Sequence, residues 1–249
     1  MTRLVHAELL KLWTTRTARV LLVLAAAGTA ALIAAVLLLA GRPGQPALGE
    51  DALRQLLLVP AQPLTLAALV LGILGMAGEL RHGTATPTFL VTPRRGRVVA
   101  AKLAAAGLTG LAMALASSAA VLATGLPWLR ARGVEVALAD PGAAARVAGL
   151  AVAVALFAVL GTGLAALLHN QVAALVVGLL WWSQGVERVL AGLLQQPGLE
   201  RWLPMGAASA LTRPGDGTLP MWAGALVFAA YGLVLALLGA RLVVRRDLT

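Results

Sequence analysis

Six long runs of apolar residues limit what this chain can fold into more than any other feature of its sequence. A helix needs about 20 apolar residues to cross the roughly 30 Å hydrocarbon core of a bilayer. The runs that approach this length are 20–40, 64–78, 103–126, 147–168, 172–194 and 221–239. Because they are continuous instead of alternating, they indicate helices and not the strands of a barrel. We therefore predict an all-α membrane protein with six transmembrane helices in a single domain, residues 1–249.

The composition supports a membrane protein. Hydrophobic residues make up 60% of the 249 residues and charged residues 12%, about half the charged share of an average soluble domain. A net charge of +10 would suggest a nucleic-acid partner only if cations and stacking aromatics shared a polar face. Here the cations flank the apolar runs, so we expect membrane lipid as a partner and no nucleic acid. The absence of Cys excludes disulfides, thiolate metal sites and Cys nucleophiles.

The distribution of charge predicts the orientation. With six crossings, both termini lie on the same side as the second-to-third and fourth-to-fifth connections. That side holds twelve Lys and Arg residues and three carboxylates, a net charge of +9. The other side holds eight Lys and Arg residues and seven carboxylates, a net charge of +1. The more positive side is expected to be cytoplasmic, so we predict a multi-pass cell-membrane protein with both termini in the cytoplasm. The first run has 21 residues, longer than the signal-peptide core of about 7 to 15, and we expect it to stay uncleaved.

The first 19 residues predict an amphipathic helix ahead of the first run. One helical face holds apolar residues at spacings of four, three and one: Val5, Leu9, Leu12 and Trp13. The other face holds mostly polar residues: Arg3, Glu8, Lys11 and Thr15. Followed by Arg16, this segment fits an elbow helix that lies on the inner leaflet and bends into the first span. The alternative is an ordinary basic flank that only sets topology.

The connection between the second and third runs contains more than topology requires. Residues 78–102 read GELRHGTATPTFLVTPRRGRVVAAK. Gly83-Thr84 breaks the preceding helix, and Thr84 can cap a short helix that presents Phe89 to the membrane or to a partner. A positive-inside connection needs only Lys and Arg. We therefore favour a structured segment over a plain basic loop, which is the alternative.

A second helix start follows within the same segment. Thr92 suits an N-cap and Pro93 the first helical position. The predicted helix runs from there through Lys102 into the third span. Its first turns carry a basic cluster at headgroup depth: Arg94, Arg95 and Arg97.

These features occur in an order that resembles a known family. E-x-R-x-G-T at 79–84, a short apolar stretch, T-P-x-R at 92–95 and a Lys opening the next helix resemble the first cytoplasmic loop of ABC-2 type permeases, the membrane subunits of one class of ATP-binding-cassette exporters. The basic N-terminus resembles their elbow helix, and LERWLPMGAASALT at 199–212 is similar to a stretch that often precedes their last span. The resemblance covers the chain, with most of its specificity in residues 79–102. Pro87 and a second Arg at position 95 depart from the family pattern.

The resemblance implies a mechanical role. In that family the short helix after the second span docks into a groove on a separate nucleotide-binding subunit. The residues that would couple this chain to the ATPase are Glu79, Arg81, Gly83, Thr84, Phe89, Thr92, Pro93, Arg94 and Lys102. ATP and Mg²⁺ would bind to that cytoplasmic partner, and this chain would bind no cofactor. Two permease subunits, identical or different, would enclose a path by which a hydrophobic or amphipathic substrate leaves the cytoplasm or the inner leaflet.

We do not expect the chain to be an enzyme by itself. A P-loop needs Gly immediately before its Lys, and the two lysines of this chain, Lys11 and Lys102, follow Leu and Ala. The three histidines are far apart and lack metal-ligand spacing: His6, His82 and His169. We therefore predict neither catalytic nor metal-binding residues, and ATP hydrolysis in a partner subunit.

Two other functional classes stay open at this point. A proton-coupled transporter needs ionisable groups near the middle of the membrane, and the charges inside a predicted span are Glu187 and Arg188, near its end. These two either lie in the outer interface, where the helix frays at Gln184, or line an outer gate beside extracellular re-entrant or surface helices formed by residues 195–218. A non-transporting membrane protein, such as an immunity or scaffold subunit, would use the same loop only to recruit a cytoplasmic partner.

Overall fold

The computed structural model describes residues 1–40, 52–81, 95–134, 141–196 and 198–245. Within these ranges the regular structure is entirely helical, as the continuous apolar runs predicted. The helices are α1 (Thr2–Thr14), α2 (Arg16–Leu39), α3 (Ala52–Leu58), α4 (Ala61–Arg81), α6 (Arg95–Ala131), α7 (Pro141–Leu168), α8 (Gln171–Trp182), α9 (Gly185–Leu194), η1 (Glu200–Trp202), α10 (Pro204–Thr212) and α11 (Met221–Arg245).

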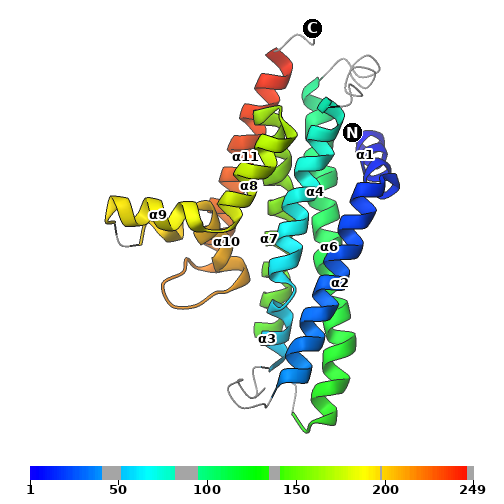
Figure 1. The fold of residues 1–249 in the computed structure, drawn as a ribbon, viewed down its shortest axis with the longest axis vertical. Coiled ribbons are helices and arrows are strands. Elements are labelled where there is room, and N and C mark those ends of the chain that lie inside the picture. Colours follow the sequence, from blue (N-terminus) through cyan, green and yellow to red (C-terminus); the bar gives the residue numbers. More distant parts are fainter. Residues whose placement is uncertain (41–51, 82–94, 135–140, 197, 246–249) are drawn as a thin grey trace.

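Five helices in the described ranges are long and apolar enough to cross a membrane. They are Arg16–Leu39, Ala52–Gly78, Gly96–Ala131, Pro141–Leu168 and Met221–Leu242. Each corresponds to one of the predicted runs, so the chain is a membrane-embedded, multi-pass helical protein. α1, the N-terminal part of α6 and the C-terminal part of α11 lie toward the same end of the bundle (Figure 1).

The fifth predicted run does not form one continuous helix. α8 ends at Trp182 after 12 residues, which is about 18 Å of helix at 1.5 Å per residue. Gln184 then adopts a left-handed conformation with φ 62°, and α9 begins at Gly185 and projects from the side of the bundle (Figure 1). The prediction of a single span over 172–194 was therefore wrong, because a left-handed residue cannot continue an α-helix.

The ends of the second and third predicted runs also shift. α3 occupies Ala52–Leu58 inside a region expected to be a loop, and its Leu56 and Leu57 are almost fully buried among residues of α6 and α7. α6 continues past the predicted end of its run, with Pro127 inside the helix, to Ala131. The helical structure therefore extends beyond the apolar runs where leucines can pack against neighbouring helices.

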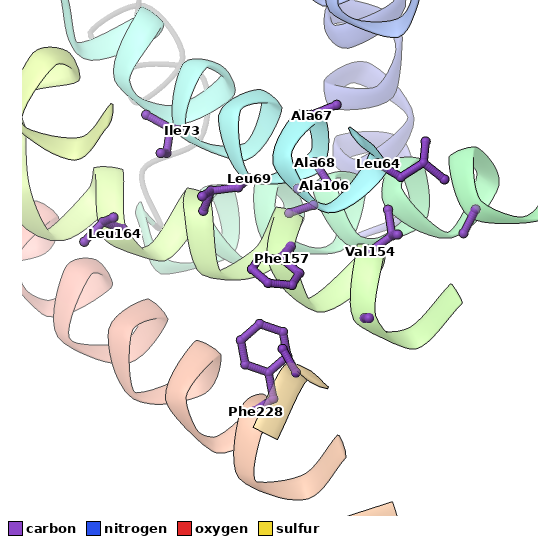
Figure 2. Packing of buried hydrophobic residues seen from close by; sticks show 14 of the residues in the cluster. Leu64, Ala67, Ala68, Leu69, Ile73, Ala106, Val154, Phe157, Leu164 and Phe228 are labelled. Carbon is purple, nitrogen blue, oxygen red and sulfur yellow. The ribbon is translucent and has the colours of Figure 1, made fainter. Parts of the chain in front are cut away.

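α7 is the central helix of the bundle and packs along α4, α6 and α11. Phe157 of α7 meets Phe228 of α11 edge to face, with ring centroids 4.8 Å apart and an interplanar angle of 63°. Figure 2 shows the two rings facing each other, with Leu69 of α4 near Phe157, and Ile73 of α4 and Leu164 of α7 further along their helices. Such aromatic geometry is favourable beyond the area it buries. The main buried cluster of the described residues is therefore built around α7.

Glycines allow the closest helix approaches in this core. A Cβ atom built on Gly72 of α4 would overlap the carbonyl oxygen of Ala158 in α7, and one built on Gly161 would overlap the carbonyl oxygen of Leu69. Between α6 and α7, a Cβ on Gly110 would come within 2.7 Å of the Val154 carbonyl oxygen. Small residues at such positions let backbones pack closely in membrane proteins. They fix α4 and α6 against α7.

Candidate functional site

The N-terminus forms a separate helix that ends at a bend before α2. α1 covers Thr2–Thr14, and Thr15 has an extended conformation with φ −73° and ψ 129°. Hydrogen bonds hold the bend, among them one from the backbone N–H of Thr15 to the Lys11 carbonyl oxygen at 3.0 Å and one from the Arg19 side chain to the Thr14 carbonyl oxygen at 3.2 Å. The predicted helix of residues 1–19 is present only as far as Thr14, and the predicted elbow residue Arg16 already belongs to α2. The role of α1 as an elbow on the inner leaflet stays a prediction.

A buried carboxylate joins this helix to α6. Lys102 Nζ lies 2.7 Å from Glu8 Oε2, and Lys11 Nζ lies 2.8 Å from Glu8 Oε1. Glu8 and Lys102 are each 7% exposed. The prediction that Glu8 lies on the polar, solvent-facing side of the amphipathic helix was wrong, because Glu8 is the buried residue of α1. Helical periodicity could not reveal its partner, which lies 94 residues further along the chain.

The ion pair lies where four helices meet. A cavity of about 20 Å³ beside it is lined by residues of α1, α4, α6 and α7, including Leu12, Gly75 and Thr162. Removing two charges from water is costly, and their attraction offsets that cost only when the geometry is good and further hydrogen bonds are made. Glu8 meets both conditions, because each carboxylate oxygen accepts a charge-assisted hydrogen bond from a different Lys. The arrangement therefore holds α1 in one position on α6.

The pKa of Glu8 reflects the same contacts. Burial acts to raise the pKa of this carboxyl, but the charge of Lys102, its hydrogen bond and the contribution of Lys11 together outweigh burial. The pKa of Glu8 is consequently held below its usual value of 4.5. The carboxyl is ionised at neutral pH, and both lysines are attracted to it.

α6 connects this ion pair to the segment that resembles a coupling loop. The helix is continuous for 37 residues from Arg95, and Lys102 lies near its beginning. From Arg95 onward, this confirms the prediction of a continuous helix that runs through Lys102 into the third span. The predicted cap, Thr92 and Pro93, lies outside the described residues.

The other predicted coupling residues divide into two groups. Gly83, Thr84, Phe89 and Arg94 lie outside the described residues. Glu79 and Arg81 lie in the last turn of α4. Lys102 is thus the member of the predicted coupling set whose side-chain contacts are described, and they lead to the predicted elbow residues Glu8 and Lys11. Of the remaining two elbow residues, Trp13 is 57% exposed and Arg16 is also exposed.

A second buried carboxylate lies at the start of α9. Glu187 is 3% exposed. Its Oε1 accepts hydrogen bonds from Trp181 Nε1 at 2.6 Å and from the backbone N–H of Met205 at 2.8 Å. Its Oε2 accepts one from the backbone N–H of Gly206 at 3.2 Å. Met205 and Gly206 belong to the first turn of α10, where N–H groups lack helical partners. Glu187, from another part of the chain, therefore caps that helix.

Glu187 and Arg188 therefore have different surroundings. Arg188 is exposed and donates to Gln184 Oε1 at 3.0 Å. Burial raises the pKa of Glu187, and the hydrogen bonds that it accepts oppose that rise only in part. The predicted short helices within 195–218 are present as η1 and α10, whereas a gate formed by Glu187 and Arg188 stays a prediction.

One further interhelical contact was not predicted. Trp182 Nε1 donates to Thr65 Oγ1 at 3.3 Å, which ties α8 to α4. The Trp181-Trp182 pair could have signalled this, because a buried indole N–H usually has a hydrogen-bond partner. The identity of that partner depends on how α4 and α8 pack, which a single sequence does not reveal.

The described residues contain no group of three or more His, Cys, Asp or Glu side chains that could hold a metal ion. What they bring together is a junction of charged and small residues between helices. No protein-family model and no curated protein sequence matches the chain.

Proposed function

We propose that this chain is the permease subunit of an ABC exporter. It would move a hydrophobic or amphipathic substrate out of the cytoplasm or the inner leaflet, using ATP hydrolysed by a separate nucleotide-binding subunit. Support comes from the resemblance of residues 79–102 to the coupling loop of ABC-2 permeases and from the five helices able to span a membrane. Export requires a path that a second permease subunit would help to enclose.

The observation that carries this proposal is the ion pair between Glu8 and Lys102. A push on residues 82–94 would reach the start of α6 directly, and the 2.7 Å contact between the two side chains would pass it to α1. α1 leads into α2 through the bend at Thr15, so two membrane helices would move together. A plain topological loop has no need of a buried charge pair that costs desolvation.

The proposed topology has six crossings with both termini in the cytoplasm. α8 would be the fifth crossing. Support comes from the turn before it: α7 ends at Leu168 and α8 starts at Gln171, with Asn170 as an N-cap that accepts from the backbone N–H groups of Val172 and Ala173. So short a connection makes consecutive helices antiparallel. α8 is short for a crossing, and the lipid around it would have to thin locally.

The absence of Cys makes this topology directly testable. Four exposed positions would each be changed singly to Cys, and intact cells would be treated with a membrane-impermeant maleimide. Arg132→Cys and Arg213→Cys should react in intact cells, whereas Arg3→Cys and Arg241→Cys should react only after lysis. Reaction of Arg3→Cys and Arg241→Cys from opposite sides would mean an odd number of crossings and would contradict the topology.

The test of function is co-expression with candidate ABC ATPases. The purified complex and its ATP turnover would be measured for the unchanged chain, for Glu79→Ala and for a Gly83-Thr84 double replacement. Both variants should lower complex recovery or turnover by about tenfold, equivalent to about 1.4 kcal/mol. Arg132→Ala, just after the C-terminal end of α6, is the control and should leave both measurements unchanged.

Two outcomes would contradict this function. Unchanged complex and turnover in both loop variants would show that the segment does not couple the two proteins. A complex that forms normally but gives no ATP-dependent movement of a hydrophobic dye in proteoliposomes would instead favour a non-transporting subunit that only recruits a partner.

A further inference from the structure

α8 ends near the middle of the bundle's membrane thickness. α7 runs beside both α8 and α10, so positions along α7 measure depth. Trp182, the last residue of α8, lines a cavity together with Phe157 of α7. Phe157 is 11 residues from the end of α7 at Leu168, a rise of about 16 Å. α8 therefore ends about half-way through a hydrocarbon core of roughly 30 Å.

α10 continues from that depth toward the other end of α7. Met205, in its first turn, lines the same cavity as Phe157. Near the other end of α10, the carbonyl oxygen of Leu211 would overlap a Cβ atom built on Gly149 of α7, which is 19 residues from Leu168, about 28 Å. α8 and α10 thus occupy successive halves of one membrane thickness, and α9 projects sideways between them (Figure 1). α10 supplies the length that α8 alone lacks.

The break between these two half-helices is held together by Glu187. Its carboxylate accepts from Trp181 at the end of α8 and from the backbone N–H groups of Met205 and Gly206 at the start of α10. Irregular backbone at membrane depth is tolerated only where it is buried in protein or lines a water-filled cavity. Glu187 satisfies the buried N–H groups, and the cavity lies on the other side of the break.

The cavity at the break is small and polar. Its volume is about 30 Å³, and one ordered water needs about 10 to 15 Å³, so there is room for about two. Polar and apolar atoms share its wall about equally. The polar lining comes from α4, from the turn after α8, and from α10 and the residue that follows it: Gln62, Thr65, Gln184, Ser209, Thr212 and Arg213.

The polar lining offers both donors and acceptors. Ser209 Oγ donates to the Gly206 carbonyl oxygen at 2.6 Å, and Thr212 Oγ1 donates to the Ala208 carbonyl oxygen at 3.2 Å. A hydroxyl that has donated its hydrogen can still accept, whereas an amide NH₂ group and a guanidinium donate. Water does both and so matches this lining. A hydrocarbon chain in the cavity would leave the polar groups without partners, which is costly.

The cavity deepens from an exposed end toward a buried floor. Gln62 and Arg213 are exposed, and they lie at the start of α4 and just after α10. Phe157 is 3% exposed and Met205 8%. The exposed end is the one that the proposed topology makes extracellular.

We propose that the break between α8 and α10 is a hydrated site, in which about two water molecules reach from Gln62 and Arg213 to the depth of Phe157 and Met205. Discontinuous membrane helices form polar ligand sites in transporters, and this break has the polar lining of such a site. That the polar end of an exported amphiphile replaces this water rests on the proposed function; the presence of the water does not.

The first test is radiolytic footprinting of the unchanged full-length chain in lipid nanodiscs, without an ATPase. X-ray pulses convert bound water into hydroxyl radicals, which oxidise the side chains that the water touches, and mass spectrometry measures the rate for each Met. Met205 should be oxidised several times faster than Met76. Met76 is the matched control, because it is also buried, at 3% exposed, and does not line the cavity.

Two variants test whether the oxidation depends on the cavity. Ser209→Leu replaces a polar lining residue by a larger apolar one, so it should displace the water and lower the rate at Met205 to that at Met76. Ser183→Leu is the control: Ser183 belongs to the same break, but it is exposed and does not line the cavity. In that variant the rate at Met205 should not change.

The side from which water enters can be tested in intact cells. The chain has no Cys, so Ser209→Cys would carry a single thiol at the cavity. A membrane-impermeant methanethiosulfonate bearing a sulfonate group should modify this thiol before lysis. Ala158→Cys is the control, because Ala158 lies in the core at 2% exposed and does not line the cavity; its thiol should stay unmodified.

Three results would overturn the proposal: equal oxidation rates of Met205 and Met76 in the unchanged chain, an unchanged rate at Met205 in Ser209→Leu, or no modification of Ser209→Cys before or after lysis. The first comparison holds even if Ser209→Leu fails to fold. Modification of Ser209→Cys only after lysis would contradict the proposed topology and leave the hydrated site in place. Because no ATPase is present in the footprinting, failure of the exporter proposal can be told apart from failure of this one.

Discussion

The indole N–H of Trp181 and the carboxylate of Glu187 form a 2.6 Å hydrogen bond across the break between α8 and α9. Trp181 belongs to the last turn of α8 and Glu187 to the first turn of α9. The same carboxylate accepts the backbone N–H groups of Met205 and Gly206. One side chain therefore fixes the direction in which the chain leaves α8 and the place where α10 begins.

Glu187→Ala should destabilise the protein by about 1 to 3 kcal/mol, because the buried N–H groups of Met205 and Gly206 would lose their acceptor. A lower midpoint of thermal unfolding in detergent would report this. Arg188→Ala is the neighbouring control: its side chain is exposed, and such changes usually alter stability by no more than about 0.5 kcal/mol. Equal effects of the two variants would contradict the capping role.

Glu8→Leu should destabilise the protein by about 3 to 5 kcal/mol, because it breaks a buried ion pair by removing one partner. Lys102→Met should cost less, because Glu8 keeps its hydrogen bond from Lys11. The double variant should recover most of that loss, since apolar residues can replace a buried ion pair at little cost. Thermal unfolding of the four proteins forms a double-mutant cycle that isolates the interaction.

Lys11→Met is the control for that cycle. The Lys11 side chain is 45% exposed, and exposed ion pairs contribute only about 0 to 1 kcal/mol. If the double variant is stable but lowers ATP turnover of the complex, the ion pair serves coupling and not only folding. If the double variant lost as much stability as the two single variants combined, the buried pair would be refuted.

Acidification should release α1 from α6. The pKa of Glu8 in the folded protein is below 4.5, so its ion pair stabilises docking above that pH and the stabilisation is lost as pH falls through the folded-state pKa. Spin labels at Leu10→Cys and Ala100→Cys, both exposed positions, would measure the distance between the helices. The distribution of distances should stay constant down to about pH 5 and broaden below the ordinary Glu pKa. In Glu8→Gln the distance should not depend on pH in this range.

Gly72→Ala should destabilise the contact between α4 and α7. The added Cβ would meet the backbone of Ala158, which cannot rotate away as a flexible side chain can, and such overpacking costs about 1 to 3 kcal/mol. Gly78→Ala, in the same helix, has nothing within 4 Å of its new Cβ and should stabilise the helix by about 0.5 to 1 kcal/mol. Thermal unfolding of both variants would check these opposite signs, and a loss of stability in Gly78→Ala would show that it too is a contact point.

The sequence predicted the helical class well because continuous apolar runs have few physical alternatives in a membrane. The predicted run begins at the first residue of α11, and the runs for α2 and α7 begin within two helical turns of the first residue of each helix. The sequence wrongly predicted one span over 172–194, although fraying at Gln184 was one of its two alternatives, and a left-handed conformation of Gln184 separates α8 from α9 there. An apolar window measures transfer to lipid and contains no information on backbone direction.

The site was predictable only in part. Glu8, Lys11 and Lys102 were each chosen from the sequence, but for separate roles, because helical periodicity relates residues within about two turns. Their meeting depends on how α1 packs on α6. Likewise, a chain with 27 Gly contains many glycine pairs by chance, and only the packing shows that Gly72 and Gly161 contact α7 and α4 while Gly78 contacts neither.

The enclosure of α7 by other helices has a consequence for how this sequence can evolve. From residue 153 to 168 no position of α7 is exposed, so a deep mutational scan should find this stretch intolerant at every position. On α2, in contrast, the buried residues recur every four positions from Ala25 to Leu37. Its tolerance should rise and fall with each helical turn, and neutral drift should accumulate on the side of α2 away from the bundle.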